Sequence, residues 1–401
     1  MIRANWRKTL ALLLALLLVI TPLVACGQSA PEEEEPPVET EAPETPEPIE
    51  PEPEMPELRL PGDTIAGIGR YEVIFELDDM PLLWEEMYHY LQSTRRMLES
   101  VMVIEDWDAD SEELDADGEP MTFNEILIHN AIENALQHRA VQWLFNDLGE
   151  TLEEDHYQET KAEYMEAFGM SEEEFLAMLW ENYLTEGTFA YIFSVLAMRD
   201  QAMIALYGEQ GEAVPAEAID AFVEEHEVLR AKHILLSIRD ENNQDLPEAE
   251  QAEVRAAADA IFEEVTALQG DARLTLFDEL IIEVGEDPGM FSNPEGYVFM
   301  EGVMVPEFFD GTRALAYGEI SPPIRSGFGY HIILRLPVEG DQEVMQPGMQ
   351  PGAPPETVQR MAAISHMREL LEEIKEELQA QYRTTPLFDR IVPGEIFAAA
   401  E

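Results

Sequence analysis

Hydrophobic positions recur at helical spacing over most of the segment from residue 82 to residue 226. Thr122 with Glu125, and Ser171 with Glu174, each match the capping-box pattern. In that pattern a hydroxyl and a carboxylate three residues apart satisfy free backbone N–H groups at the start of a helix. The segment is therefore predicted to form an all-helical region.

A strand is expected before this region, because apolar residues alternate with other residues over residues 71–77. The expected helices run from Asp79 and Pro81 to about Val103, from Thr122 to about Gly149, from Ser171 onward, over 186–207, and from Pro215 onward.

The pattern changes near residue 228, where strands and helices begin to mix. The expected order over about 110 residues is β–α–α–β–α–β–β, which favours a small antiparallel-type sheet flanked by helices. The elements with distinct patterns are a strand at 228–238, helices at 247–269 and 274–282, a helix from Pro306, and strands at 321–326 and 329–336. The fold class is therefore α+β.

The chain after this unit is predicted to contain a loop, a helix and a tail. Residues 344–355 are rich in Met, Pro and Gly, which indicates a flexible loop. A charged helix is expected over 356–382, and residues 386–397 are expected to be extended.

The N-terminus has the pattern of a targeting segment. Basic residues at positions 3, 7 and 8 precede an aliphatic run over residues 10–20, which is shorter than the roughly 20 residues of a membrane-spanning helix. The sequence "LVAC" that follows resembles the bacterial lipobox, and this resemblance implies that Cys26 carries a lipid and becomes the first mature residue. An ordinary signal peptide with an incidental cysteine is the alternative. Cys26 is the only cysteine, so a disulfide, a Cys/His zinc site and a cysteine nucleophile are excluded in the mature chain.

Composition narrows the classes of partner. The chain has 84 acidic and 23 basic residues, a formal net charge of −61, which repels nucleic-acid phosphates and excludes nucleic-acid binding. Residues 27–61 are dominated by proline and glutamate and are interpreted as an extended tether.

An acidic segment at 106–117 has aspartates at alternate positions, as a calcium-binding loop does. An EF-hand loop has glycine at its sixth position and glutamate at its twelfth, where this chain has Ser111 and Asp117. A solvated loop is therefore favoured, and calcium binding is left open.

Five motifs in residues 228–338 resemble, in order and spacing, those of the parvulin family of peptidyl-prolyl isomerases. They are "AKHILL" (231–236), "GEDPG" (285–289), the segment 296–315, "GEISPPI" (318–324) and "GFGYHIIL" (327–334). The resemblance implies a parvulin domain with His233 and His331 hydrogen-bonded on neighbouring strands, and with Asp287 facing the substrate carbonyl.

The same resemblance implies that Met304 and Phe308 line a proline pocket, with Phe299 and Phe328 closing it. Taken alone, Met304 and Phe308 are typical core residues, and Asp287 before Pro288 is typical of a turn. The histidine pair is either catalytic or only maintains the shape of the site. The family's chemistry needs no cofactor, and no metal is expected.

Two departures from the family pattern bear on activity. The glycine-rich family signature before the pocket helix here reads "NPEGYVFMEG", and Phe328 stands where some members have a small hydroxyl residue. The loop after the first strand, 239–251, is acidic. Recognition of phosphorylated Ser/Thr–Pro needs cationic ligands and is therefore not expected.

The flanking segments resemble the extracytoplasmic foldases and chaperones of the PrsA and SurA type. The function implied is a lipid-anchored prolyl isomerase at the extracytoplasmic face of a cell membrane, with unfolded exported polypeptides as partners; the alternative is a holdase chaperone with a weak or inactive isomerase domain. The expected parts are a lipoprotein signal peptide (1–26), a tether (27–61), a helical lobe (62–227), the parvulin domain (228–338), a flexible loop (339–355), and a C-terminal helix and tail packing on the lobe (356–401).

Overall fold

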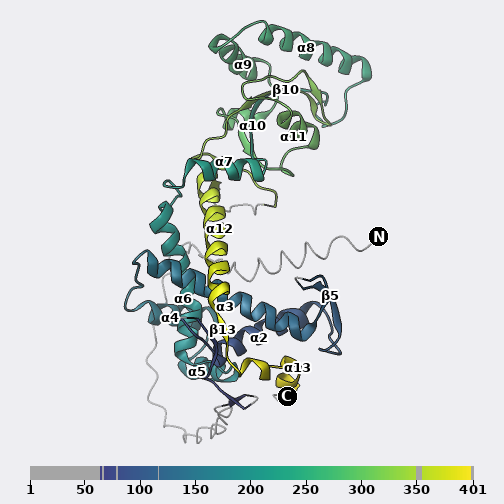
Figure 1. Ribbon diagram of the computed structural model, residues 1–401. Helices are drawn as coiled ribbons and strands as arrows, with labels where there is room; N and C mark the ends of the chain where they lie inside the picture. Colours follow the sequence, from purple (N-terminus) through teal and green to yellow (C-terminus); the bar gives the residue numbers. More distant parts are fainter. Residues whose placement is uncertain (1–63, 66, 78–79, 116, 349–354, 399–401) are drawn as a thin grey trace, which may run out of the picture. The chain divides into compact units, whose positions relative to one another are not determined.

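The structure is a computed structural model that describes residues 64–65, 67–77, 80–115, 117–348 and 355–398 (Figure 1). All of them belong to one compact unit, Arg59–Glu401. The predicted signal peptide with the lipobox Cys26, the whole tether (27–61) and Asp79 lie outside the described residues.

The predicted helical region is confirmed. Both capping boxes form, with the Thr122 and Ser171 hydroxyls accepting from the backbone N–H groups of Glu125 and Glu174. The helices are α2 (Trp84–Val101), α3 (Phe123–Asp147), α4 (His156–Phe168), α5 (Glu172–Glu181), α6 (Glu186–Tyr207) and α7 (Ala216–Glu225). Helix α4 was not anticipated from the sequence, and its N-cap residue, Asp155, makes no side-chain capping bond.

Helix α2 begins later than the predicted start at Pro81. Residues Leu82–Leu83 are extended and form β4, which pairs antiparallel with β3 (Val73–Glu76). Strand β3 pairs on its other side with β13 (Arg383–Thr384), so segments from near both ends of the described chain share one sheet.

Three two-stranded sheets were not anticipated. The acidic segment predicted to be a solvated loop contributes β5, which pairs with β6, and Asp108 accepts a hydrogen bond from the side chain of Asn124. The strands are β1 (Thr64–Ile65), β2 (Ile68–Gly69), β5 (Asp110–Leu114), β6 (Pro120–Thr122), β11 (Glu343–Val344) and β12 (Glu356–Thr357). Strand β11 lies in the segment that was predicted to be a flexible loop.

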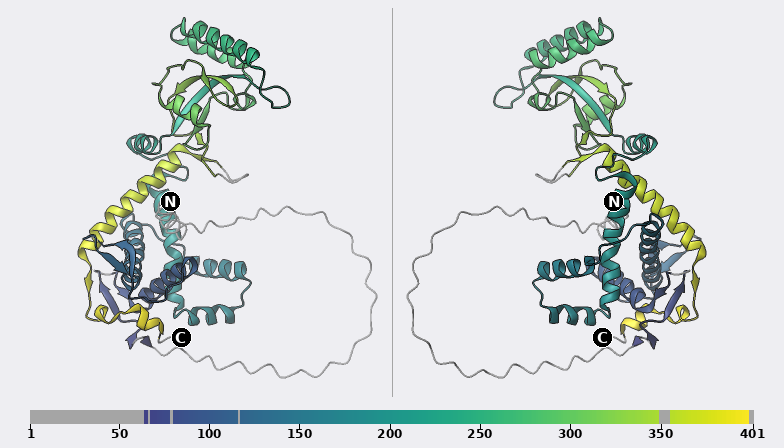
Figure 2. Two further views of the ribbon diagram at one scale, coloured as in Figure 1. Left: turned by 90° about the vertical axis from the view of Figure 1, so that its right-hand side faces the viewer. Right: turned by 90° about the vertical axis from the view of Figure 1, so that its left-hand side faces the viewer.

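The C-terminal helix α12 (Val358–Gln381) returns to the helical region (Figure 1, Figure 2). Its buried residues Ala363, Met367 and Leu371 share a hydrophobic cluster with residues of α3 and α6. The prediction that the tail is extended is wrong. The tail forms a 3-10 turn at Phe388–Arg390 and helix α13 (Pro393–Ala398), because its apolar side chains are buried against α2 and α3.

Helix α6 is long and apolar enough to cross a membrane by length and composition alone, with a mean hydropathy of 1.3. Its Val195 and Ala202 nevertheless belong to the cluster shared with α3 and α12. Much of the remaining surface of α6 stays accessible, including Leu196 and Ile204.

The mixed unit contains a four-stranded antiparallel sheet in the order β8-β7-β10-β9, and the predicted order of elements is confirmed apart from one additional short helix, α10. The elements are β7 (Leu229–Ser237), α8 (Glu248–Thr266), α9 (Asp271–Glu283), α10 (Pro288–Ser292), β8 (Tyr297–Phe299), α11 (Pro306–Arg313), β9 (Ile324–Arg325) and β10 (Gly329–Leu336). The short helix α10 occupies what the sequence indicated as a turn region.

The two central strands are apolar on both sides because both faces of the sheet are covered. Alternate residues point to opposite faces. Ile234 and Ile332 pack in the cluster that includes residues of α8 and α9, whereas Ala231 and Ile333 pack with residues of α11. A polar side chain on the α11 face therefore lies within an apolar layer.

Candidate functional site

The register of β7 and β10 brings the two predicted histidines together. Ile333 lies opposite His233, so His331, two residues before Ile333, lies diagonally across from His233 on the same face. Their Nδ1 atoms are 3.1 Å apart, and the two rings are inclined by only 22°. Both side chains are buried.

Asp287 lies at the N-cap of α10 and contacts His233 from outside the sheet. Its Oδ2 is 2.7 Å from His233 Nε2 and accepts from the hydroxyl of Tyr297 at 2.8 Å, while Oδ1 accepts from the backbone N–H of Gly289 at 3.0 Å. Asp287 is therefore both a turn residue and a member of the predicted site.

Ser326 extends the network at its other end. Its hydroxyl oxygen lies 2.7 Å from His331 Nε2 and accepts from the backbone N–H of Phe328. Asp287 can only accept when it is ionised, so His233 donates to it from Nε2. With one proton on each imidazole, His233 Nδ1 accepts from His331 Nδ1, and His331 Nε2 accepts from Ser326, so that the hydrogen bonds all run toward Asp287.

Electrostatics favour a neutral His331 and an ionised Asp287. Burial, followed by the nearby His233, lowers the pKa of His331 to about 4. Burial acts to raise the pKa of Asp287, but hydrogen bonds from His233, Tyr297 and Gly289 outweigh it and lower that pKa to about 2. Burial and the bond to Asp287 raise the pKa of Tyr297. At neutral pH, His331 is uncharged and Asp287 is a carboxylate.

The predicted pocket residue Phe308 lies against the histidine pair. Its ring meets the rings of His233 and His331 edge-on, with centroids 4.9 and 5.5 Å apart. Met304 is partly buried in the same cluster, and Phe299 is fully buried behind Phe308. Phe299 therefore supports the apolar wall from within and does not itself reach the surface.

Phe328, also predicted to close the pocket, lies in the turn between β9 and β10. Its side chain is 49% exposed, and the guanidinium of Arg239 lies 5.3 Å from the centre of its ring. The position of Phe328 next to Ser326 leaves an aromatic surface at the end of the hydrogen-bonded chain.

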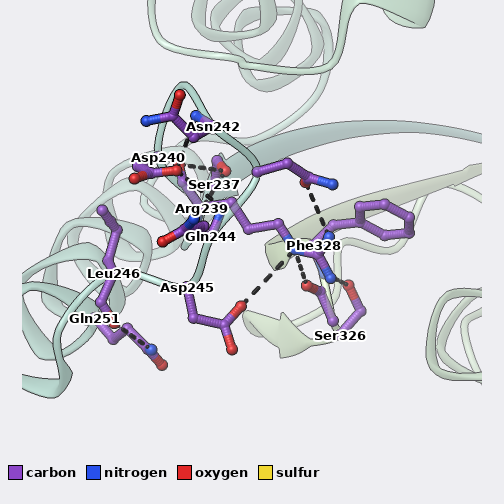
Figure 3. Close-up of polar contacts among 12 residues, drawn as sticks. Ser237, Arg239, Asp240, Asn242, Gln244, Asp245, Leu246, Gln251, Ser326 and Phe328 are labelled. Atoms are coloured by element: carbon purple, nitrogen blue, oxygen red, sulfur yellow. Dashed lines mark hydrogen bonds and ion pairs between the residues drawn. The ribbon is translucent and has the colours of Figure 1, made fainter.

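An open cleft of about 290 Å³ borders this turn (Figure 3). Arg239 crosses it, donating to the carbonyl of Gly327 at 2.8 Å and to the side chain of Asn243 at 2.9 Å, with Asp245 at 3.9 Å. The lining residues are Ile238, Arg239, Asp245, Glu307, Arg325, Ser326 and Gly327. Arg239 and Arg325 both line the cleft, and the carboxylates of Asp245 and Glu307 in the same lining balance their charge.

Tyr297, Gly289 and Ser326 belong to the network but were not identified from the sequence. The position of Ser326 offered a local signal, since it lies five residues before His331, in the turn that joins β9 to β10. Tyr297 had none, because its contact with Asp287 depends on how α10 packs beside β8.

Comparison with known proteins identifies the domain. Residues 233–336 match the family described as "Rotamase: PPIC-type PPIASE domain". The chain is 29% identical over 188 residues to foldase protein PrsA of Oceanobacillus iheyensis, covering 45% of this chain and 54% of that protein. It is 33% identical over 106 residues to chaperone SurA of Chromohalobacter salexigens, covering 26% of this chain and 21% of that one.

The chain therefore spans about half the length of the Oceanobacillus relative, and less of the SurA relative. Among solved structures, a peptidylprolyl isomerase (PrsA) from Bacillus cereus is 18% identical and covers 73% of this chain and 93% of its own, with a TM-score of 0.23.

Proposed function

Because residues 233–336 form a parvulin-type peptidyl-prolyl cis-trans isomerase domain within a PrsA/SurA-like chain, we propose that this protein rotates X–Pro bonds in polypeptides that have not finished folding. The observation that carries the proposal is the buried chain of hydrogen bonds from Asp287 through His233 and His331 to Ser326, which lies against the ring of Phe308.

Isomerisation of an X–Pro bond requires no cofactor, only an apolar surface for the proline ring and polar groups held in fixed positions. Rotation about the peptide bond has a barrier of ~18–20 kcal/mol, because twisting the amide breaks its resonance. A site accelerates the rotation if it holds the proline ring in an apolar slot and favours the twisted amide over both planar forms. Phe308 and Met304 supply the apolar surface, and Asp287 with the histidines supplies fixed polar groups. Covalent catalysis by a thiol is excluded, because Cys26 is the only cysteine in the chain.

The setting proposed for this activity is the extracytoplasmic face of a membrane, with Cys26 carrying a lipid and exported polypeptides as substrates. The basic and aliphatic start of the chain, followed by "LVAC", supports this location. The relatives PrsA and SurA, a foldase and a chaperone, support polypeptides as the class of partner.

A holdase chaperone is the second candidate, and the helical region favours it. Three helices of that region pack together and leave large apolar side chains exposed to solvent. These side chains are Trp143 on α3, Leu196 and Ile204 on α6, and Ile364 on α12. Such a surface can hold unfolded segments whether or not the isomerase site is active.

An isomerase assay on a proline-containing peptide, combined with a refolding assay limited by prolyl isomerisation, tests the proposal with the full-length protein. His233→Ala and Asp287→Ala are expected to lower kcat/KM by roughly tenfold or more, which corresponds to about 1.4 kcal/mol in the barrier. The matched control is His129→Ala, which removes an exposed histidine of α3 and is expected to leave the rate unchanged.

A wild-type protein that accelerates neither reaction would contradict the isomerase proposal. Suppression of aggregation by that same inactive protein would support the holdase function instead.

A further inference from the structure

Tyr297 reaches the isomerase site from the edge of the sheet. It is the first residue of β8 and lies opposite the small residue Ala231 of β7. His233 is two residues further along β7 and therefore points to the same face as Ala231. The ring of Tyr297 extends toward it, with the two ring centroids 6.1 Å apart. The hydroxyl then donates to Asp287 Oδ2 at 2.8 Å.

Gly289 makes room for this hydroxyl. A β-carbon placed at residue 289 would lie 1.9 Å from Tyr297 Oη and 3.1 Å from its Cζ, so a side chain at 289 and the present position of Tyr297 exclude each other. The backbone N–H of Gly289 also donates to Asp287 Oδ1. Gly289 and Tyr297 therefore hold one carboxylate oxygen each.

The consequence for Asp287 follows from counting acceptor positions. A carboxylate oxygen has about two lone pairs. Oδ2 uses both, one for His233 Nε2 and one for Tyr297, whereas Oδ1 uses one for Gly289. The carboxylate is thus fixed in one orientation, with Oδ1 the oxygen that keeps a free lone pair. Its orientation in turn sets which nitrogen of His233 carries the proton.

We propose that Tyr297, seated against Gly289, is a positioning residue of the isomerase site: its hydroxyl fixes the Asp287 carboxylate and, through it, the tautomers of His233 and His331. This inference rests on the proposed isomerase function for its kinetic readout. Its spectroscopic readout is independent of that function.

The test uses the full-length protein with Tyr297→Phe, which removes only the hydroxyl. The expected result is a fall in kcat of about 3- to 10-fold with KM changed less than twofold, since the loss is that of one hydrogen bond to a charged group that orients the site. Selective ¹⁵N labelling of histidine should show the Nε2–H proton resonance of His233 shifting, while the thermal midpoint stays within a few degrees of wild type. The matched control is Tyr317→Phe, because Tyr317 is 60% exposed and lies under the guanidinium of Arg335.

Gly289→Ala provides the second arm. In the wild-type background it should displace Tyr297 and reproduce the kinetic and spectroscopic changes of Tyr297→Phe. In the Tyr297→Phe background it should add less, because the atom closest to the new methyl group is gone; this non-additivity reports that the two residues act as a pair.

The two possible failures are distinguishable. An inactive wild-type protein would refute the isomerase function. The histidine resonances of Tyr297→Phe would then be the test of the positioning role. Unchanged His233 resonances in Tyr297→Phe would overturn the inference, and so would an unchanged kcat in an active protein. Fully additive effects of the two substitutions would also overturn it.

Discussion

His331 lies in the middle of the hydrogen-bonded chain, with Nδ1 bonded to His233 and Nε2 bonded to the hydroxyl of Ser326. A second proton on its ring would leave neither nitrogen able to accept and would place a charge in a buried site. Burial and His233 lower the pKa of His331 to about 4, well below the usual value near 6.5. The folded protein therefore resists this protonation through the mildly acidic range.

This predicts the pH dependence of isomerisation. From pH 8 down to about 5.5, protonation of His331 should not lower kcat/KM, and kcat/KM should fall as the pH approaches 4, where His331 gains its proton. Asp287 stays ionised across this range, since its pKa is about 2. The profile is measured with a peptide assay that does not depend on a pH-sensitive coupling enzyme. An acid limb centred near 6.5 would show instead that His331 titrates as an exposed imidazole does.

A buried ion pair with its hydrogen-bond partners joins helices α2 and α3, and no local sequence pattern predicts it. Arg139 of α3 contacts both carboxylate oxygens of Glu86 of α2, at 3.0 and 2.7 Å, and donates to the carbonyl oxygens of Met80 and Pro81. Tyr90 donates to the same carboxylate. Both charged side chains are buried, so each needs the charge of the other to offset its loss of hydration.

Removing one member should therefore be costly. Arg139→Met is expected to lower the free energy of unfolding by about 3–5 kcal/mol, because the charge of Glu86 is left buried and unpaired. Urea unfolding followed by the helical circular dichroism signal measures this change. Arg199→Met is the control: it breaks an ion pair with Asp200 whose members are about one-third and more than half exposed, and it should change stability by less than about 1 kcal/mol.

Adding Glu86→Leu to Arg139→Met should restore part of the loss, since no buried charge then remains. Equal stability of the two variants would argue that the cost came from lost packing alone.

At the scale of the whole molecule, the net charge bears on how the protein can attach to a membrane. A formal net charge of −61 repels anionic surfaces, so electrostatic attraction cannot hold this chain at a membrane that carries anionic lipids. The anchor proposed at Cys26 supplies the attachment that the charge opposes, and the Pro/Glu-rich tether at 27–61 is proposed to hold the folded part away from the lipid surface.

Cys26→Ser is accordingly expected to move the protein from the membrane fraction to the soluble fraction and to abolish incorporation of a labelled fatty acid. Fractionation of the producing cells, with immunodetection of both fractions, provides the measurement. Ser29→Ala, three residues beyond the lipobox, serves as the control. Absence of lipid label from the wild-type protein would refute the anchor.

The sequence by itself determined the elements whose signals are local. The capping boxes at Thr122 and Ser171 lie within one helical turn, and the apolar runs of β7 and β10 are read from adjacent residues. The pairing of His233 with His331 also came from the sequence, but through a family resemblance rather than from periodicity.

The tertiary structure alone decided the rest. The tail is helical because α2 and α3 offer an apolar surface to Ile396 and Phe397. Tyr297 meets Asp287 because a small residue lies opposite it on β7 and a glycine lies where its hydroxyl passes. A hydrogen bond between side chains on different elements depends on the register of the strands and on how closely the elements approach at that point. The spacing of hydrophobic residues along the chain predicts neither.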